Sequence, residues 1–229
     1  MVAPVRRFGT MFMQTHRKSG IAMTTIAVVS AGLSEPSSTR LLADRLAGSA
    51  VAAITADQPG GSVDVRHVEL RPIAHEIVDA MLTGFAAPGL AAAQATVLEA
   101  DAVVFVTPVF TAGVSGLAKS FLDVLDKDAM TDVPVLLAAT GGTARHSLAI
   151  DHALRPVFAY LRAAVVPTGV FAATDDWGSP EDAAALDARI RRAGVDLAWA
   201  IRSSRRTPQR TDALPETVDF ASLLGGLGH

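Results

Sequence analysis

Short apolar runs alternate with helical segments along the chain from Thr24 onward, and this alternation constrains the fold more than any other feature. Such alternation is typical of βαβ units, in which crossover helices join parallel strands. The pattern predicts five strands, at residues 25–30, 62–70, 102–107, 133–139 and 165–173. It also predicts helices at residues 37–56, 73–83, 88–99, 115–126 and 147–162, and a last helix striped by Leu186, Ile190, Leu197 and Ile201.

Five strands in this sequence order indicate an open, doubly wound α/β sheet with helices on both faces, which is a three-layer sandwich. The strand order 2-1-3-4-5 is favoured over 3-2-1-4-5-6, because only five strands can be counted. The run at 102–107 is continuously apolar, as a central parallel strand requires. Pro167 and Gly169 interrupt the last strand, and Gly194 weakens the last helix.

Composition excludes several classes of protein and of site. Hydrophobic residues make up 50% of the 229-residue chain, which is long enough to bury one sizeable core. The apolar runs are far shorter than the ~20 residues that a membrane span needs, and a net charge of −3 gives no basic field for nucleic acid. The chain has no cysteine, which excludes disulfides, thiolate metal sites and cysteine nucleophiles. We therefore expect a cytoplasmic protein that binds neither membranes nor nucleic acid.

Both ends of the chain lack the pattern of the central part. Residues 1–23 carry basic residues without acidic ones and have no periodic apolar face, so we expect a disordered N-terminal extension. The folded domain is expected at residues 24–203, followed by a linker and C-terminal tail at residues 204–229. Within the tail, residues 218–224 fit one amphipathic turn that docks on the domain or on a partner subunit.

The loop after the first strand is rich in hydroxyl groups. In an open parallel sheet, ligands bind outside the carboxyl ends of the strands. Ser34, Ser37, Ser38 and Thr39 lie there, at the start of a helix whose free N–H groups suit a phosphate. Helix capping by serine without a ligand is the alternative. The chain has no G-x-G-x-x-G motif and no P-loop in this region, which argues against a dinucleotide or a nucleoside triphosphate.

Two further loops are expected at the same edge of the sheet. The loop after the third strand runs from Thr107 to Gly116, and its Phe110 is an aromatic side chain against which a planar ring fits. The loop after the fourth strand contains Gly141 and Gly142, where the backbone is able to approach a ligand closely. The histidines have no metal-ligand spacing, and no carboxylate pair or Ser/His/Asp set emerges. We therefore name no catalytic acid or base and no metal site.

Taken together, these loops resemble the NADPH-dependent FMN reductases of flavodoxin-like fold. The resemblance is carried by VVSAGLSEPSSTRLLADRL, TPVFTAGVSGLAKSFLDVLD, AATGGTARHSLAIDHALRPVFAYLRA and VVPTGVFAATDDWG. It is nearest to the reductases that partner luciferase-like monooxygenases, which are related to the alkanesulfonate-system reductases. The resemblance implies a flavodoxin-like sandwich with FMN at the three loops.

The resemblance also implies a role for individual residues. Ser37, Ser38 and Thr39 would hold the FMN phosphate, and Ser34 of the same loop is a further candidate. The residues that would flank the isoalloxazine ring are Pro108, Val109, Phe110 and Ser115, and those on its pyrimidine side are Thr140, Gly141, Gly142 and Thr143. Phe110 stands where relatives usually have Tyr, and Val114 replaces an aromatic residue or His, so fewer contacts to the ring are expected.

The function implied is an NAD(P)H-dependent FMN reductase that uses NADPH or NADH and supplies reduced flavin to a partner monooxygenase. An NAD(P)H:quinone or azo reductase, in which the flavin stays bound, is one alternative, and a non-enzymatic flavodoxin-like electron carrier is another. The resemblance implies a homodimer or homotetramer. The predicted helix at 115–126 favours this too, because Leu117, Phe121, Leu122 and Leu125 exceed one buried stripe.

Overall fold

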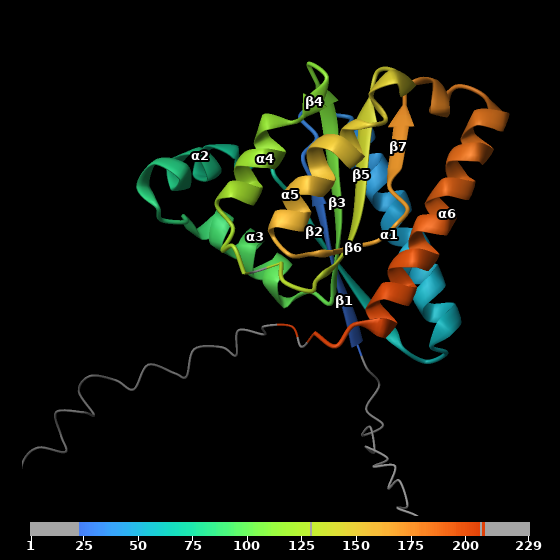
Figure 1. Ribbon diagram of the computed structural model, residues 1–229, viewed down its shortest axis with the longest axis horizontal. Helices are drawn as coiled ribbons and strands as arrows, with labels where there is room; N and C mark the ends of the chain where they lie inside the picture. Colours follow the sequence, from blue (N-terminus) through green and yellow to red (C-terminus); the bar gives the residue numbers. More distant parts are fainter. Residues whose placement is uncertain (1–22, 129, 207, 209–229) are drawn as a thin grey trace, which may run out of the picture.

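The computed structural model describes residues 23–128, 130–206 and 208, and these form a parallel sheet between two layers of helices (Figure 1). Its central strands are β2 (Ser62–Glu69), β1 (Met23–Ser30), β3 (Ala102–Phe110) and β5 (Pro134–Gly141), hydrogen-bonded in that order. Two short strands, β6 (Ala164–Val165) and β7 (Val170–Ala173), both pair with β5 in parallel. The predicted order 2-1-3-4-5 is confirmed, with the fifth position filled by two pieces.

The break in the last strand lies where the sequence predicts it. Strand β6 pairs with the start of β5 and β7 with its end, and Pro167 and Gly169 lie between them. Proline has no N–H to donate to the ladder. A Cβ at Gly169 would lie 2.9 Å from Cγ2 of Ile150, so the backbone passes the neighbouring helical segment too closely for a side chain.

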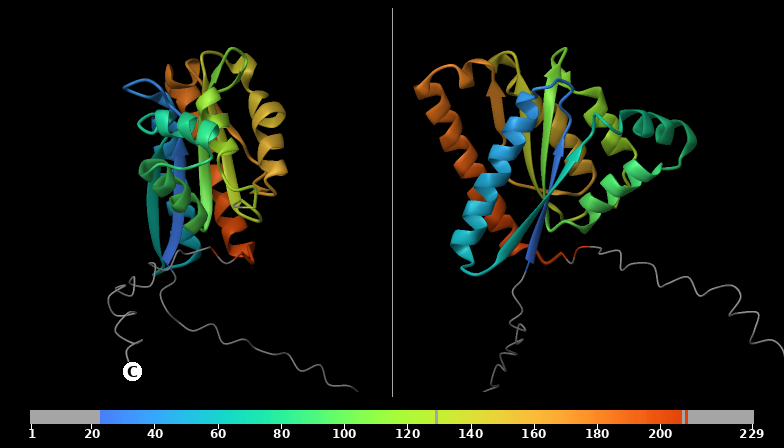
Figure 2. Two further views of the ribbon diagram at one scale, coloured as in Figure 1. Left: turned by 90° about the vertical axis from the view of Figure 1, so that its left-hand side faces the viewer. Right: turned by 180° about the vertical axis from the view of Figure 1, so that it is seen from behind.

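The helices cover both faces of the sheet. Helices α1 (Ser38–Asp57) and α6 (Pro180–Ser203) pack on one face, which Figure 2 shows from that side. Helices α3 (Pro88–Glu99), α4 (Gly116–Asp123) and α5 (Arg155–Tyr160) pack on the other, together with α2 (Ala74–Thr83). Each face has its own cluster of buried aliphatic and aromatic side chains. The three-layer sandwich is therefore confirmed.

The expected helix at 147–162 is irregular. A 3-10 turn (Ala144–His146) and a π-helical turn (Ile150–Leu154) precede the shorter α5. The N–H of Arg155 donates to the carbonyl of Ile150, one residue further back than in an α-helix. Pro156 follows immediately and has no N–H, so the regular hydrogen-bond ladder is interrupted at this place.

The additional apolar side chains of α4 and of the turn after it pack inside the subunit. Phe121, Leu122 and Leu125 are 0%, 3% and 8% exposed, and Leu117 packs partly buried against the same core. The burial of these residues is therefore explained within the subunit, and the homodimer or homotetramer stays a prediction. Helix α4 is covered by the sheet on one side and by α2 and neighbouring segments on another, so it buries more than one stripe.

Gly194 in α6 permits close contact with α1. A Cβ at this position would lie 2.8 Å and 2.9 Å from the backbone C and O of Ser49, and Ser49 Oγ donates to the carbonyl of Ile190 at 3.1 Å. The low helix propensity of this glycine is therefore offset by helix–helix packing.

Gly194→Ala is expected to lower the free energy of unfolding by about 1–3 kcal/mol, because the two helix backbones must separate. Gly48→Ala on α1 is the matched control, since a Cβ there meets no atom within 4 Å. It should raise the free energy of unfolding by roughly 0.5–1 kcal/mol through helix propensity alone. Urea denaturation of both variants measures the difference, and equal stabilisation by the two alanines would contradict this account of the contact.

The predicted N-terminal extension, except Met23, lies outside the described residues, and so does the predicted turn at 218–224. Helix α6 ends at Ser203, and the domain limits of 24 and 203 stay a prediction. Among the described residues, no single helix is long and apolar enough to cross a membrane. Only α2 and α3 taken together pass that test of length and composition, and they are bent by 92°.

Candidate functional site

The three predicted loops lie next to one another at the carboxyl ends of β1, β3 and β5. The N–H of Ala31 donates to the carbonyl of Val106 at 3.0 Å, which joins the first loop to β3. Pro108 stands opposite Thr140 in the pairing of β3 with β5, which places the second and third loops side by side. The parallel register therefore brings together residues that are far apart in the sequence.

The first loop ends in a capped helix N-terminus. Ser37 is the N-cap of α1, and its Oγ accepts a hydrogen bond from the N–H of Arg40 at 3.2 Å. The ladder of α1 begins with Leu41 N–H, which donates to the carbonyl of Ser37. The N–H groups of Ser38 and Thr39 thus stand outside the helix ladder, at its positive end.

The shape of this loop fits a phosphate. A Cβ at Gly32 would lie 2.1 Å from Oγ of Ser37, so the loop closes tightly over the helix start. The side chains of Ser34 and Ser38 are exposed. A hollow of about 360 Å³ is lined by Gly32, Ser34 and Ser37, and the carboxylates of Glu35, Asp44 and Glu69 also border it. Exposed hydroxyls beside free N–H groups are the donor set that phosphate oxygens require.

Thr39 has a different position from the three serines. Its side chain is 3% exposed, and its Oγ1 lies 2.8 Å from Oγ1 of Thr140, with either atom able to donate. This buried hydrogen bond ties the first loop to the third. The hydroxyl of Thr39 therefore faces the protein interior. The backbone N–H of Thr39 lies with that of Ser38 at the N-terminus of α1.

The charged residues around the first loop are largely paired. Arg40 forms ion pairs with Asp44, at 2.7 Å, and with Glu69. Burial lowers the pKa of His67 below its ordinary value, and the charge of Arg40 lowers this pKa further, whereas Asp44 and Glu69 raise it. His67 is therefore neutral at pH 7 and adds no positive charge, and the attraction for an anion comes from the helix start and the hydroxyls.

The second loop is a short hairpin rather than an open connection. Strand β3 continues to Phe110, and β4 (Gly113–Val114) pairs back on it in the antiparallel direction. Thr111 and Ala112 form the turn with φ of 48° and 62°, in the left-handed region that non-glycine residues seldom adopt. Phe110 is 48% exposed at this turn. The hairpin therefore presents one aromatic side chain at the edge of the site.

Thr107 fixes the base of this hairpin, and the sequence analysis did not single it out. Its Oγ1 donates to the carbonyl of Pro108 at 3.0 Å and accepts from the N–H of Ser115 at 3.2 Å. Pro108, Val109 and Ser115 are buried. A buried threonine at the end of an apolar strand is the only signal of this role in the sequence.

The two glycines of the third loop serve different purposes. A Cβ at Gly141 would lie 2.9 Å from Cζ of Phe171 on β7, so this glycine permits close packing of the loop on the sheet. A Cβ at Gly142 would meet no atom within 4 Å, and this residue is exposed. Thr143 caps the following 3-10 turn by accepting from Arg145 N–H at 3.4 Å. The backbone at Gly142 is thus open to the edge of a ligand.

The arrangement supplies phosphate donors at one end and an open backbone edge at the other. Among the described residues, no group of three or more His, Cys, Asp or Glu side chains is placed to hold a metal ion. The site therefore suits binding and orientation of an anionic, ring-bearing ligand.

Comparisons with known proteins identify the family. A family model described as NADPH-dependent FMN reductase matches residues 24–178. The FMN reductase (NADPH) of Pseudomonas aeruginosa is 36% identical over 169 residues, which cover 73% of this chain and 87% of that protein. The NADH-dependent FMN reductase SfnF of Pseudomonas fluorescens is 33% identical over 169 residues, with coverages of 73% and 87%.

Solved structures agree with this family. An oxidoreductase of Corynebacterium diphtheriae superimposes with a TM-score of 0.74 and 47% identity, covering 79% of this chain and 97% of that chain. The apo form of the NADH:FMN oxidoreductase EMOB has a TM-score of 0.59 and 27% identity, with coverages of 75% and 89%. The chain belongs to the NADPH-dependent FMN reductase family and is therefore an oxidoreductase that uses FMN and a nicotinamide nucleotide.

Proposed function

We propose that the chain reduces FMN with NADPH or NADH at the three loops and releases the reduced flavin to a flavin-dependent monooxygenase. One observation supports this binding site most strongly. The N-terminus of α1, with its free N–H groups, lies next to the exposed Gly142 loop, and the buried Thr39–Thr140 hydrogen bond joins the two. Ser34, Ser37 and Ser38, with the N–H of Thr39, hold the phosphate. The N–H groups of Gly142 and Thr143 face the pyrimidine side of the ring.

The protein contributes position and electrostatics to this reaction. The bound flavin would supply the hydride acceptor and the nicotinamide the hydride, so the redox chemistry would belong to the two cofactors. The backbone at Gly141 and Gly142 orients the ring edge, and its N–H dipoles favour the negative charge that develops there. Pro108, Val109 and Ser115 form the floor beside Phe110. No side chain is required as a general acid or base.

Release of reduced flavin follows from the small number of ring contacts. Phe110 is the exposed aromatic residue of the hairpin, and Val114 packs partly buried against the core, so it offers no stacking face. An aromatic contact contributes about 0.5–1.5 kcal/mol beyond burial. The loss of one such contact raises the dissociation constant for flavin by roughly tenfold. A weakly held flavin fits a reductase that supplies a second enzyme, and a lack of cysteine fits a reducing compartment such as the cytoplasm.

Steady-state kinetics test this function directly. The full chain is assayed with FMN, FAD, riboflavin and a quinone as acceptors, under NADH and under NADPH. We expect turnover to saturate with FMN, and FMN to give a higher kcat/KM than riboflavin. If turnover needs a quinone and the flavin stays bound in a one-to-one ratio, the chain is a quinone reductase and this proposal is wrong.

We also propose that the chain forms a homodimer or homotetramer through the face of α4 and α5. Tyr160 is 79% exposed there and borders a cavity of about 500 Å³ that Pro156, Val157 and Leu122 also line. Tyrosines beside apolar pockets are frequent anchors of interfaces.

Tyr160→Glu is expected to shift the mass measured by light scattering at micromolar concentration toward the monomer. Burying an unpaired carboxylate in place of an aromatic anchor costs about 2 kcal/mol or more, or roughly a 30-fold increase in the dissociation constant. Trp199→Glu is the control, because Trp199 is also an exposed aromatic residue, at 58%, but lies on α6. A monomeric mass for the unmodified chain would reject the oligomer.

A further inference from the structure

Helix α2 carries apolar side chains on the side that faces away from the core. Its inner residues Ile77 and Ala80 are buried, whereas Val78, Met81 and Leu82 are 50%, 51% and 81% exposed. These three residues follow the spacing i, i+3, i+4, so they form a second apolar stripe on the helix. Phe85, just after the helix, is 81% exposed and extends the patch. Contiguous exposed apolar residues of this kind mark a binding surface.

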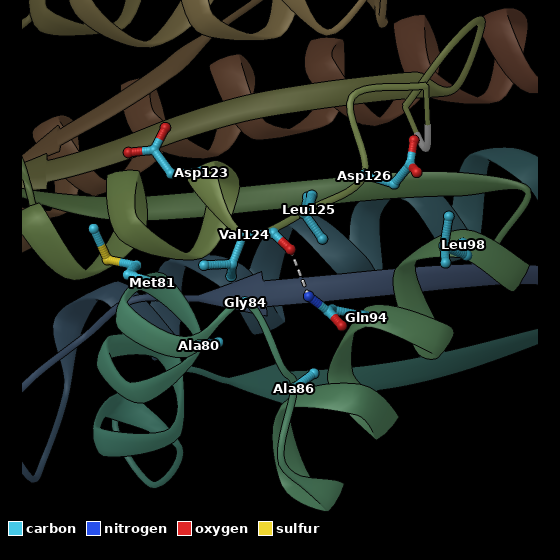
Figure 3. Close-up of a pocket in the computed structure, with 10 residues that line it drawn as sticks. All are labelled: Ala80, Met81, Gly84, Ala86, Gln94, Leu98, Asp123, Val124, Leu125 and Asp126. Carbon is cyan, nitrogen blue, oxygen red and sulfur yellow. Dashed lines mark hydrogen bonds between the residues drawn. The ribbon is translucent and has the colours of Figure 1, made fainter.

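A cavity adjoins this stripe. It has a volume of about 620 Å³ and lies between α2, α3 and α4, as Figure 3 shows. Met81 belongs both to the stripe and to the cavity wall, Leu98 lies at the other end in Figure 3, and Leu125 lies between them. The side chain of Gln94 spans the floor, with Nε2 donating to the carbonyl of Val124 at 2.7 Å. The stripe and the cavity therefore adjoin at Met81, and we call them together the α2 groove; the cavity wall also carries the carboxylates of Asp123 and Asp126.

The last described residues of the chain contact the end of α3. The guanidinium of Arg206 donates to the carbonyl of Ala100 at 2.6 Å and to that of Leu98 at 2.8 Å. Leu98 itself lines the groove. Arg206 thus holds the described end of the chain at the end of α3, where Leu98 lines the α2 groove, and Arg206 itself lines a separate cavity with Trp199 and Ser203.

The segment beyond Arg206 contains a set of apolar residues with matching spacing. Phe220, Leu223 and Leu224 also follow i, i+3, i+4, and residues between 207 and 217 are mostly polar or charged. Helical segments that dock in a groove place their anchors at this spacing. We propose that these three residues of the same chain dock in the α2 groove and cover its apolar stripe.

The length of the chain permits this contact. Eleven residues lie between Pro208 and Phe220, and the twelve steps from one to the other span at most about 40 Å when extended. Helix α3, which links the Arg206 anchor to the α2 end of the groove, has 12 residues and is about 18 Å long. A flexible chain of that length has a root-mean-square span of about 19 Å. Such tethering gives an effective concentration on the order of millimolar, far above micromolar protein.

Disulfide cross-linking tests the proposal, because the natural chain has no cysteine to interfere. Cysteines are placed on both sides of the predicted contact, in a Leu82→Cys/Leu224→Cys variant of the full chain. Mild oxidation should give a cross-link within one chain, seen as a mobility shift without a doubling of mass. Its rate should exceed that of the control by about tenfold or more, as expected for docking rather than random collision.

The control is a Val195→Cys/Leu224→Cys variant. Val195 is 59% exposed and apolar like Leu82, but it lies on α6, at the other end of the molecule from α2 (Figure 1). Equal rates of cross-linking in the two variants would overturn the proposal. Cross-links of Leu82→Cys/Leu224→Cys that form only between chains would overturn it too, because a second copy would then cover the stripe.

Hydrogen exchange on the chain without cysteine substitutions gives an independent test. Removing residues 209–229 should speed amide exchange of residues 78–86 about tenfold, and leave exchange in α6 unchanged. Phe220→Ser/Leu223→Ser should have the same effect as the truncation, whereas Thr217→Ala/Ser222→Ala should have none. Unchanged exchange in residues 78–86 after truncation would overturn the proposal. FMN reduction should be unaffected in all these variants, since none of the substituted or deleted residues belongs to the three loops.

Discussion

Replacing Ser34 and Ser38 together by alanine should weaken FMN binding by about 10²–10⁴-fold and leave riboflavin binding unchanged. Both hydroxyls are exposed beside the N-terminus of α1. Each charge-assisted hydrogen bond to a phosphate contributes roughly 1.5–3 kcal/mol, and 1.4 kcal/mol corresponds to one factor of ten. Neither serine is the N-cap, so α1 keeps its capping bond. Flavin titration by fluorescence quenching measures both dissociation constants.

A Ser62→Ala/Ser203→Ala variant is the matched control for this experiment. Both of these serines are exposed, one at the start of β2 and the other at the end of α6, on the edge of the sheet opposite the three loops. Its FMN affinity should equal that of the parent chain. Equal affinity of the unmodified chain for FMN and riboflavin would exclude a phosphate site at this loop.

Gly32→Ala should lower both FMN affinity and stability. The new Cβ would lie 2.1 Å from Oγ of Ser37, so the serine side chain must leave its capping position. Loss of the cap costs about 1 kcal/mol, which lowers the melting temperature by several degrees at most. FMN affinity should fall by about 10–100-fold, because the displaced side chain removes one phosphate donor and disturbs the cradle.

A second substitution separates the two effects of Gly32→Ala. In Gly32→Ala/Ser37→Gly the clashing side chain is absent, and glycine is an acceptable N-cap that costs only a few tenths of a kcal/mol. Thermal stability should recover, whereas the loss of FMN affinity should persist. Full recovery of FMN affinity would show that Ser37 donates nothing to the phosphate.

The strands were predictable because each is a buried apolar run between polar turns. Pro167 and Gly169 even located the break between β6 and β7. The hairpin of β3 and β4 was missed, because Thr111 and Ala112 adopt left-handed conformations without the glycine or asparagine that signals such a turn. Local sequence therefore predicted the parallel sheet but not the antiparallel β3–β4 hairpin.

The position of the three loops at one edge was also predictable, from the rule that parallel strands place their carboxyl ends together. The role of Thr39 was not, since its hydrogen bond to Thr140 joins residues 101 positions apart. Apolar periodicity likewise did not reveal which surplus side chains are covered. It predicted surplus apolar side chains on α4, whereas Phe121 there is fully buried and Leu82 of α2 is exposed.

Flavin delivery across a dialysis membrane tests the central claim most directly. The full chain, FMN and NADPH or NADH are dialysed anaerobically against a chamber that holds a flavin-dependent monooxygenase and its substrate, and oxygen is admitted to that second chamber only after reduced flavin has equilibrated across the membrane. The protein is expected to lose its FMN on desalting, and product is expected to form in the chamber without reductase. Flavin that stays bound in a one-to-one ratio after desalting, with no product across the membrane, would contradict this claim.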